Sequence, residues 1–184
     1  MPSSLPANMS EIAETVRKIN PKSILDVGAG FGKYGVIFRE YLDILQQRYD
    51  RKDWVAKIDA LEVWEKYITP VHKYVYNKII VADVTEDFSV TDGYELLFLG
   101  DVLEHFSREQ GLVLLESFKG KWIVINTPGP KWKDYHLSAY LENKYEAHEY
   151  IWEDDDFKEF KNWQVVTNKI VGSLRFVLLK RKGN

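Results

Sequence analysis

Residues 24–35 read ILDVGAGFGKYG, and this stretch decides the fold that the chain can adopt. A short apolar run and an acid lead into four glycines within eight positions, with a lysine among them. Glycine takes backbone conformations that other residues avoid, and it lets a backbone approach a ligand closely. A strand that ends in such a turn before a helix is typical of cofactor sites in parallel sheets.

The rest of the chain alternates apolar strands with amphipathic helices. We expect strands over five almost continuously apolar runs, as in parallel strands buried on both faces: 23–27, 57–63, 78–84, 94–102 and 121–127. The intervening segments predict helices over 11–19, capped by Ser10, and over 33–49 and 107–118. This alternation indicates an α/β fold with a Rossmann-like, doubly wound sheet that is mostly parallel.

The C-terminal end departs from this alternation. Residues 163–171 and 173–181 are two strand-like runs with Gly172 between them, and no helix fits in the gap. We therefore expect an antiparallel hairpin that completes a seven-stranded mixed sheet.

Composition bounds the class of protein. The 184 residues suggest a single domain over 1–184, in which 1–20 supplies an N-terminal helix. Lysine and arginine number 25 against 28 acids, a net charge of -3, so we expect no nucleic-acid partner. The absence of cysteine excludes disulfides and thiolate chemistry. No apolar run approaches the roughly 18 residues of a membrane span, and no signal-peptide pattern opens the chain, so we expect a cytoplasmic protein.

Three kinds of ligand site begin with a glycine turn like this one. A dinucleotide fingerprint fits Gly28 and Gly30, but its last small residue would be Lys33. A phosphate loop would need glycine at Val27 and a hydroxyl residue at Tyr34, so both of its ends fail. A turn that needs glycine only for its shape is a further alternative, although one glycine usually suffices for that.

The third kind of site fits along the whole chain. DVGAGFG resembles the first motif of the class I S-adenosylmethionine-dependent methyltransferases, an acid followed by G-x-G-x-G. The resemblance continues in order through ALEVW (60–64), ADV (82–84) and GDVLEHF (100–106), each at the end of an expected strand. The terminal hairpin matches the family's antiparallel seventh strand. The resemblance implies a methyltransferase, with S-adenosylmethionine as its cofactor and S-adenosylhomocysteine as the product.

The resemblance also implies roles for particular residues. Glu62 accepts both ribose hydroxyls, and Asp83 faces the adenine amino group, with Asp87 or a backbone carbonyl as alternatives. Asp26 holds the loop, or a water that bridges to the methionine amino group, and Tyr34 closes the pocket near the start of a helix whose N–H groups favour a carboxylate. The expected cofactor-binding set is Asp26, Gly28, Gly30, Gly32, Tyr34, Glu62, Val63, Asp83, Val84 and Asp101.

Methyl transfer is an in-line displacement in which the protein aligns the nucleophile. A hydroxyl or protonated amine also needs a base nearby. His148 is the first candidate and His136 the second, while His105 is expected to position cofactor or substrate; His72 is set aside as a residue of a surface helix. Residues 128–157 are rich in aromatic side chains and predict a substrate-side wall or lid.

No metal ion is expected. Glu146, His148 and His136 can be read as ligands, but magnesium-dependent oxygen methyltransferases cluster acids instead, and the sequence places no such cluster. The acidic run 153–156 is expected to favour the dipole at a helix N-terminus.

The expected function is methyl transfer to a small-molecule or sugar-type acceptor, on oxygen. Residues 143–157 resemble a stretch of methyltransferases that act on sugars, glycolipids or other small metabolites. The segment after the fourth strand lacks the N/D-P-P-Y/F motif of DNA amino-methyltransferases. Two alternatives stay open: a non-catalytic cofactor-binding or scaffold module, and a nicotinamide-dependent reductase, against which Lys33 and the hairpin count. The sequence does not indicate an oligomeric state.

Overall fold

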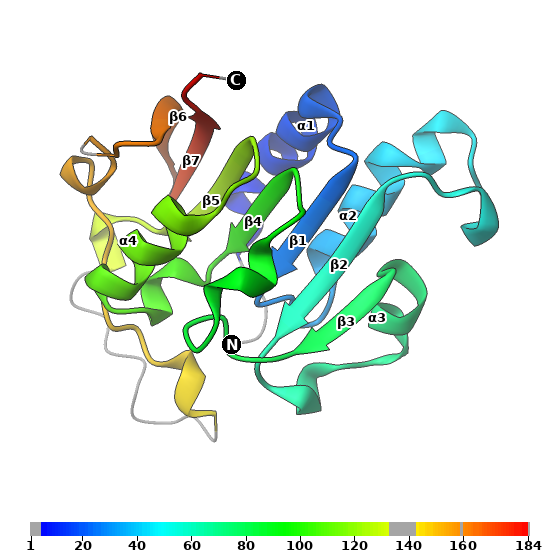
Figure 1. Ribbon diagram of the computed structural model, residues 1–184, viewed down its shortest axis with the longest axis horizontal. Coiled ribbons are helices and arrows are strands. Elements are labelled where there is room, and N and C mark those ends of the chain that lie inside the picture. The colour runs from blue at the N-terminus through cyan, green and yellow to red at the C-terminus, as the bar shows by residue number, and fades with distance from the viewer. Residues whose placement is uncertain (1–4, 133–142, 159, 184) are drawn as a thin grey trace.

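The computed structural model describes residues 5–132, 143–158 and 160–183, and it contains a seven-stranded sheet (Figure 1). The strand order is β3-β2-β1-β4-β5-β7-β6; β7 is antiparallel to both neighbours, and the other strands share one direction. This confirms the predicted fold class. The strands are β1 Ser23–Val27, β2 Lys57–Glu62, β3 Lys78–Val81, β4 Leu96–Gly100, β5 Trp122–Pro128, β6 Trp163–Val171 and β7 Leu174–Arg181.

Helices cover both faces of the sheet, as Figure 1 shows. They are α1 Met9–Ile19, α2 Lys33–Leu42, α3 Pro70–Val75 and α4 Arg108–Ser117. Among the described residues, no helix has the length and apolar character of a membrane span.

The apolar core lies in two layers, one on each side of the sheet. One layer packs under α1 and α2 and includes Ile12, Val16 and Phe38, all fully buried. The other packs under α4 and includes Leu114 and Leu115. Burial of both faces explains why the central strands read as continuous apolar runs.

The start of α1 differs from the prediction. Ser10 lies inside the helix, which begins at Met9, so its expected role as the cap is wrong. Asn8 precedes the helix and its side chain makes no capping bond there. It donates instead to the side chain of Asn126 in β5, a tertiary contact that no local pattern reports.

The second helix ends at Leu42, well before the predicted end at residue 49. Asp43 follows it and is fully buried. Its Oδ1 accepts hydrogen bonds from Arg48 Nε and Val55 N, both at 2.8 Å, and these bonds turn the chain back towards β2.

Arg39 connects α2 to two other elements. Its guanidinium is 2% exposed and pairs with Asp43. It also donates to Ala56 O at 2.8 Å, before β2, and to Val75 O at 2.9 Å, at the end of α3. The pair therefore fixes the helix that follows the glycine turn.

We predict that Asp43→Ala lowers the free energy of unfolding by about 3–5 kcal/mol, because it leaves Arg39 buried without its partner charge. Urea denaturation measures the change. Arg17→Ala is the control, since Arg17 forms an ion pair with Glu14 on the exposed face of α1, and the midpoint of this variant should stay within error. An equally small change for both variants would contradict the assigned role of the buried pair.

Candidate functional site

The glycine turn joins β1 to α2 at the carboxyl end of the sheet. Gly28, Gly30 and Gly32 have φ of +65°, +55° and +81°, a backbone conformation that residues other than glycine rarely adopt. Gly28 N donates to Leu61 O at 2.7 Å, and a Cβ on Gly28 would lie 2.3 Å from Val102 Cγ2. Glycine is therefore required at position 28 both for its backbone conformation and for the close approach of Val102.

His72 lies directly beneath this turn, so its predicted surface position is wrong. It is fully buried in α3, and its ring lies 3.5 Å from where a Cβ of Gly32 would stand. Its Nδ1 accepts from Thr69 N at 3.1 Å, which caps α3. The helix is short and presents this face inward, which the local sequence does not reveal.

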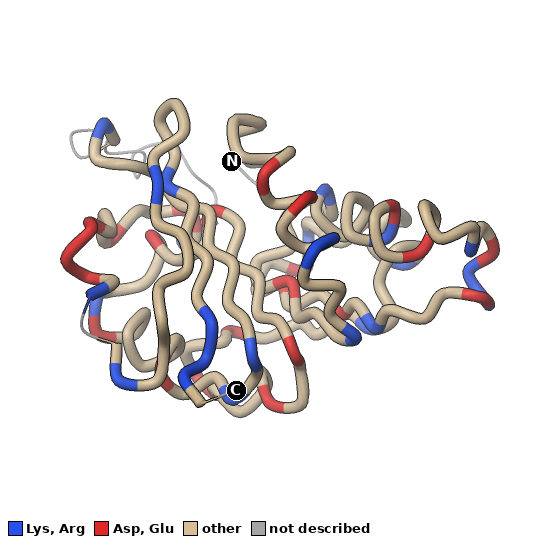
Figure 2. Tube along the Cα trace, turned by 90° about the horizontal axis from the view of Figure 1, so that it is seen from above, with Lys and Arg blue, Asp and Glu red and all other residues tan. Residues whose placement is uncertain are grey.

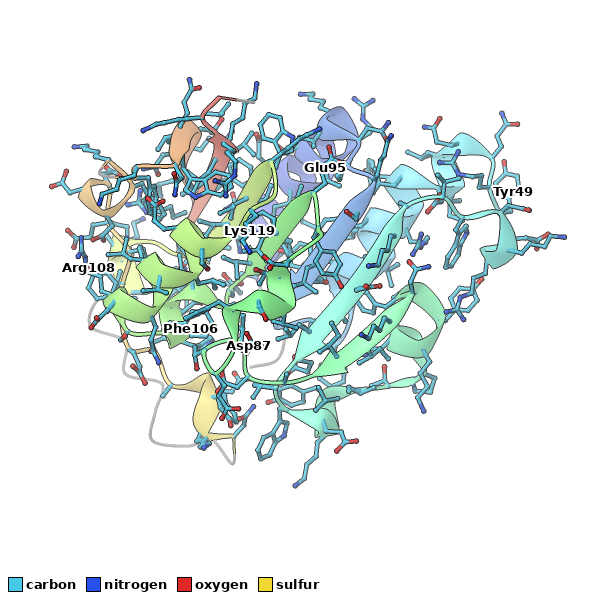
Figure 3. The ribbon with its side chains drawn as sticks, in the orientation of Figure 1. Tyr49, Asp87, Glu95, Phe106, Arg108 and Lys119 are labelled. Carbon is cyan, nitrogen blue, oxygen red and sulfur yellow. The ribbon has the colours of Figure 1, made fainter. Side chains whose placement is uncertain are left out.

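A cavity of about 340 Å³ opens beside the turn, at the carboxyl ends of the parallel strands. Open α/β sheets bind ligands at this edge. Phe106, labelled in Figure 3, belongs to its wall. The residues of the expected cofactor-binding set that line it are Gly28, Gly30, Tyr34, Glu62, Val63, Asp83, Val84 and Asp101.

Glu62 contributes to both the turn and the cavity. Its carboxylate is 4% exposed; Oε2 accepts from Gly30 N at 2.9 Å, and Oε1 accepts from Trp64 N at 2.8 Å. Burial raises the pKa of Glu62. Each carboxylate oxygen has a second lone pair, so the group can accept further hydrogen bonds from a ligand.

Asp26 lies behind the turn and does not line the cavity, and neither does Gly32. Asp26 is 1% exposed, and Tyr76 Oη donates to its Oδ2 at 2.5 Å. The same Tyr76 oxygen accepts from Gly35 N at 3.1 Å, inside the first turn of α2. Burial raises the pKa of Asp26 to about 7 against the opposing effect of the Tyr76 hydrogen bond. Asp26 is thus placed to hold the turn through Tyr76.

The two acids predicted for the adenine end lie in different places. Asp83 lines the cavity, and its Oδ1 accepts from Thr85 N at 2.9 Å and from Thr85 Oγ1 at 2.7 Å. Asp87 is exposed, caps the turn that follows it through Ser89 N, and is not among the residues described as lining the cavity. The geometry therefore favours Asp83 over Asp87 as a ligand group.

Asp101 follows β4 in a left-handed conformation, with φ of +55°. Asn126 holds it twice: its Nδ2 donates to Asp101 Oδ1 at 2.9 Å, and its backbone O accepts from Asp101 N at 2.7 Å. Asn8 donates to Asn126 Oδ1 at 2.7 Å. Sequence analysis missed both asparagines, because their partners are distant in the chain.

His105 lines one end of the cavity, and His148 packs against it outside the lining, with the two ring centroids 5.0 Å apart. His105 lines the cavity, and its Nδ1 lies 2.9 Å from Ala147 O. Burial lowers the pKa of both histidines, to about 4 for His148, where the neighbouring His105 adds to the effect. His136 lies outside the described residues.

Glu104, which sequence analysis did not select, completes this group. It is 1% exposed, and one ligating atom from each of Glu104, His105 and His148 lies within 4.8 Å of the other two. Thr127 Oγ1 donates to Glu104 Oε2 at 3.0 Å. Burial, and next the nearby charge of Asp101, raise the pKa of Glu104 well above its usual value. Such a donor set can hold a metal ion or handle a proton.

The described residues of the segment 128–157 take different places in the structure. Residues 143–147 and 149 line the cavity. Trp152, in contrast, is fully buried in the core and donates to Leu103 O at 3.1 Å, so it is no wall residue.

Two acids of the run 153–156 form ion pairs with residues distant in the chain. The prediction of a role at a helix dipole did not include these contacts. Asp156 is 6% exposed and accepts from Arg108 Nε at 2.7 Å. Asp154 pairs with Arg175 of β7. Both acids therefore fix this segment to the body of the fold.

Solved structures of known proteins share this fold. The methyltransferase domain of bacterial CtHen1 has a TM-score of 0.61 at 14% identity, covering 95% of this chain and 98% of that chain. The PH0226 protein from Pyrococcus horikoshii OT3 has a TM-score of 0.62 at 12% identity, covering 99% and 96%. The 16S rRNA methylase RmtB has a TM-score of 0.58 at 14% identity, covering 96% and 63%. No family model and no curated protein matches the sequence. At these identities the likeness shows the fold alone.

The prediction of no nucleic-acid partner is corrected by these comparisons. The similar structures include the rRNA methylase RmtB and the small RNA methyltransferase HEN1, so the fold serves RNA methylation in other proteins. The net charge of -3 is a property of the whole chain. Figure 2 shows basic and acidic residues interspersed along the trace, so the total describes no particular surface.

We predict that Asp26→Asn changes how stability depends on pH. The folded protein keeps a proton on Asp26 up to about pH 7, whereas the unfolded chain releases it near the ordinary pKa of 3.8. The stabilisation from protonated Asp26 is complete below the unfolded-state pKa of 3.8, and it is lost as the pH rises to the folded-state pKa of about 7. Relative to Asp26→Asn, the wild type should therefore lose roughly 2 kcal/mol of unfolding free energy between pH 5 and pH 8.

Urea denaturation at several pH values measures this difference, and exposed Asp50→Asn is the control. If the free energy of unfolding changed with pH in the same way for the wild type and Asp26→Asn, the raised pKa of Asp26 would be contradicted.

Proposed function

We propose that this protein transfers a methyl group from S-adenosylmethionine to an acceptor that binds at the end of the cavity marked by His105 and His148. The observation that carries the proposal is the position of Glu62. Its carboxylate lines the cavity while it accepts a hydrogen bond from Gly30 N at 2.9 Å in the turn. A glycine turn and a buried carboxylate on the next strand together suit a ligand with adjacent hydroxyls and no phosphate.

The residues of the cavity fit the parts of this cofactor. Glu62 can accept hydrogen bonds from the two ribose hydroxyls, and Asp83 can accept one from the adenine amine. Val63 and Val84 supply apolar contacts beside these acids. The N-terminus of α2, which starts at Lys33, offers N–H groups to a carboxylate. The bound cofactor supplies an electrophilic methyl group on a sulfonium.

We assign the acceptor end of the cavity to an oxygen nucleophile. A neutral hydroxyl must lose its proton when it attacks, and that task falls to the groups at this end, His148 first and His105 beside it. A small molecule or sugar is the acceptor class that residues 143–157 suggested. The RNA methylases of similar fold make RNA the second class to assay.

We predict that Glu62→Ala weakens S-adenosylmethionine binding by about 1–3 kcal/mol, or roughly 5- to 150-fold, because a charged hydrogen-bond acceptor is lost. Calorimetric titration measures the affinity, and circular dichroism checks that the variant is folded. Glu65→Ala is the matched control, since Glu65 is exposed in the turn that follows β2 and should not alter binding. Unchanged affinity in folded Glu62→Ala would remove Glu62 from the site.

We predict that His148→Ala slows methyl transfer by roughly 10²–10⁴-fold while the affinity for S-adenosylmethionine stays unchanged. Transfer of a labelled methyl group to a panel of sugars, small-molecule alcohols and RNA gives the rate. The cofactor affinity of the same variant is the internal control, because His148 is not among the described residues that line the cavity. A wild-type rate in this variant would end the assignment of His148 to the acceptor.

A further inference from the structure

Three potential metal ligands meet beside the end of the cavity that His105 lines, although they come from separate parts of the chain. Glu104 and His105 follow β4, and His148 lies beyond β5. One ligating atom from each residue lies within 4.8 Å of the other two. Ligands about 2.1 Å from a shared ion stand at most ~4.2 Å apart, so the group is close to a binding geometry. We propose that Glu104, His105 and His148 bind one divalent transition-metal ion.

Backbone contacts hold the two segments in register. The amides of Glu149 and Tyr150 both donate to Glu104 O, at 2.8 and 3.1 Å. His105 Nδ1 lies 2.9 Å from the carbonyl of Ala147, the residue before His148. These contacts fix the spacing between the residue pair after β4 and His148 in the protein without an ion.

The hydrogen bonds around the cluster match those of metal ligands. A ligating histidine almost always donates its other ring N–H to a carbonyl or carboxylate, and His105 does so to Ala147 O. That bond leaves Nε2 of His105 to bind the ion. Thr127 Oγ1 orients the Glu104 carboxylate through Oε2 at 3.0 Å. The hydrogen-bond partners that would orient His105 and Glu104 as ligands are therefore already in place.

Among the described residues, one of the three groups lacks a hydrogen-bond partner and another lacks a countercharge. His148 Nδ1 is buried and has no hydrogen-bond partner among the described residues. Glu104 is 1% exposed, and no lysine or arginine of the described part of the chain forms an ion pair with it. Buried carboxylates are found paired or bound to a metal. A bound cation would supply a countercharge to Glu104 and a partner to the His148 ring.

The ligand types select the kind of ion. Two imidazoles and one carboxylate suit Mn²⁺, Fe²⁺, Co²⁺ or Zn²⁺, whereas Mg²⁺ and Ca²⁺ favour oxygen ligands alone. Three protein ligands leave coordination positions open for water or substrate. Sequence analysis considered Glu146, His148 and His136 as ligands and expected no metal because the sequence places no cluster of acids. The structure instead groups His148 with Glu104 and His105.

The consequence for catalysis rests on the proposed methyl transfer. An ion held by Glu104, His105 and His148 would polarise an acceptor hydroxyl and lower the pKa of that hydroxyl, so that its proton would pass to water. The oxygen lone pair then forms the new C–O bond as the methyl C–S bond breaks, and the sulfur keeps that electron pair as a neutral thioether. His105 and His148 would then act on the acceptor proton through the ion, in place of direct proton removal by His148.

Titration of chelator-treated protein with Co²⁺ and with Mn²⁺ tests the site without any acceptor. Visible absorption and electron paramagnetic resonance should show one saturable ion per chain. His148→Gln and Glu104→Gln should weaken ion binding by more than the roughly 10–100-fold that loss of an outer partner costs, and Thr127→Val by about that amount. Glu146→Gln is the matched control, since Glu146 lines the same cavity outside the cluster.

Binding that the cluster variants abolish and Glu146→Gln retains would support the metal site. No saturable binding, or binding that His148→Gln and Glu104→Gln leave unchanged, would overturn it. S-adenosylmethionine affinity is measured on every variant to show that the fold and cofactor site are intact. Retained cofactor binding without ion binding would reject this inference alone, whereas loss of cofactor binding by the wild type would reject the proposed function.

Discussion

The hydrogen bond from Gly30 N to the Glu62 carboxylate, at 2.9 Å, is the contact on which the site depends. It joins the turn after β1 to the end of β2, so the two strands present their ends to one cavity. The turn can reach Glu62 only because Gly28 and Gly30 adopt positive φ, and Val102 packs where a side chain on Gly28 would stand. Sheet topology, glycine and one buried acid together create the binding edge.

The two ends of the cavity are fixed in different ways. At the end of the glycine turn, buried polar groups behind the backbone set the geometry, through Tyr76 and Asp26. At the other end, hydrogen bonds between residues distant in sequence set the geometry. Asn126 donates to Asp101, and the carbonyl of Glu104 accepts from two amides beyond β5. A ligand that spans the cavity would therefore meet a preformed site at both ends, which lowers the entropic cost of binding.

The sequence predicted what local patterns encode. The apolar runs located the strands, the Gly172 gap predicted the hairpin, and the strand-end motifs placed Glu62 and Asp83 at the cavity. Long-range contacts could not be predicted in this way: the buried face of His72 and the Asn8–Asn126 bond depend on tertiary packing. The end of α2 likewise depends on tertiary hydrogen bonds. The net charge could not exclude a nucleic-acid partner, because it is a sum over the whole chain and does not describe any one surface.

Calorimetric titration of the wild-type protein with S-adenosylmethionine, and separately with S-adenosylhomocysteine, tests the central claim most directly. The cavity beside the glycine turn predicts that both bind at one site per chain with micromolar affinity, because the two compounds share the ribose and adenine that Glu62 and Asp83 would contact. Binding of neither compound by the folded protein would contradict the account. The same fold would then serve as a scaffold module without a cofactor.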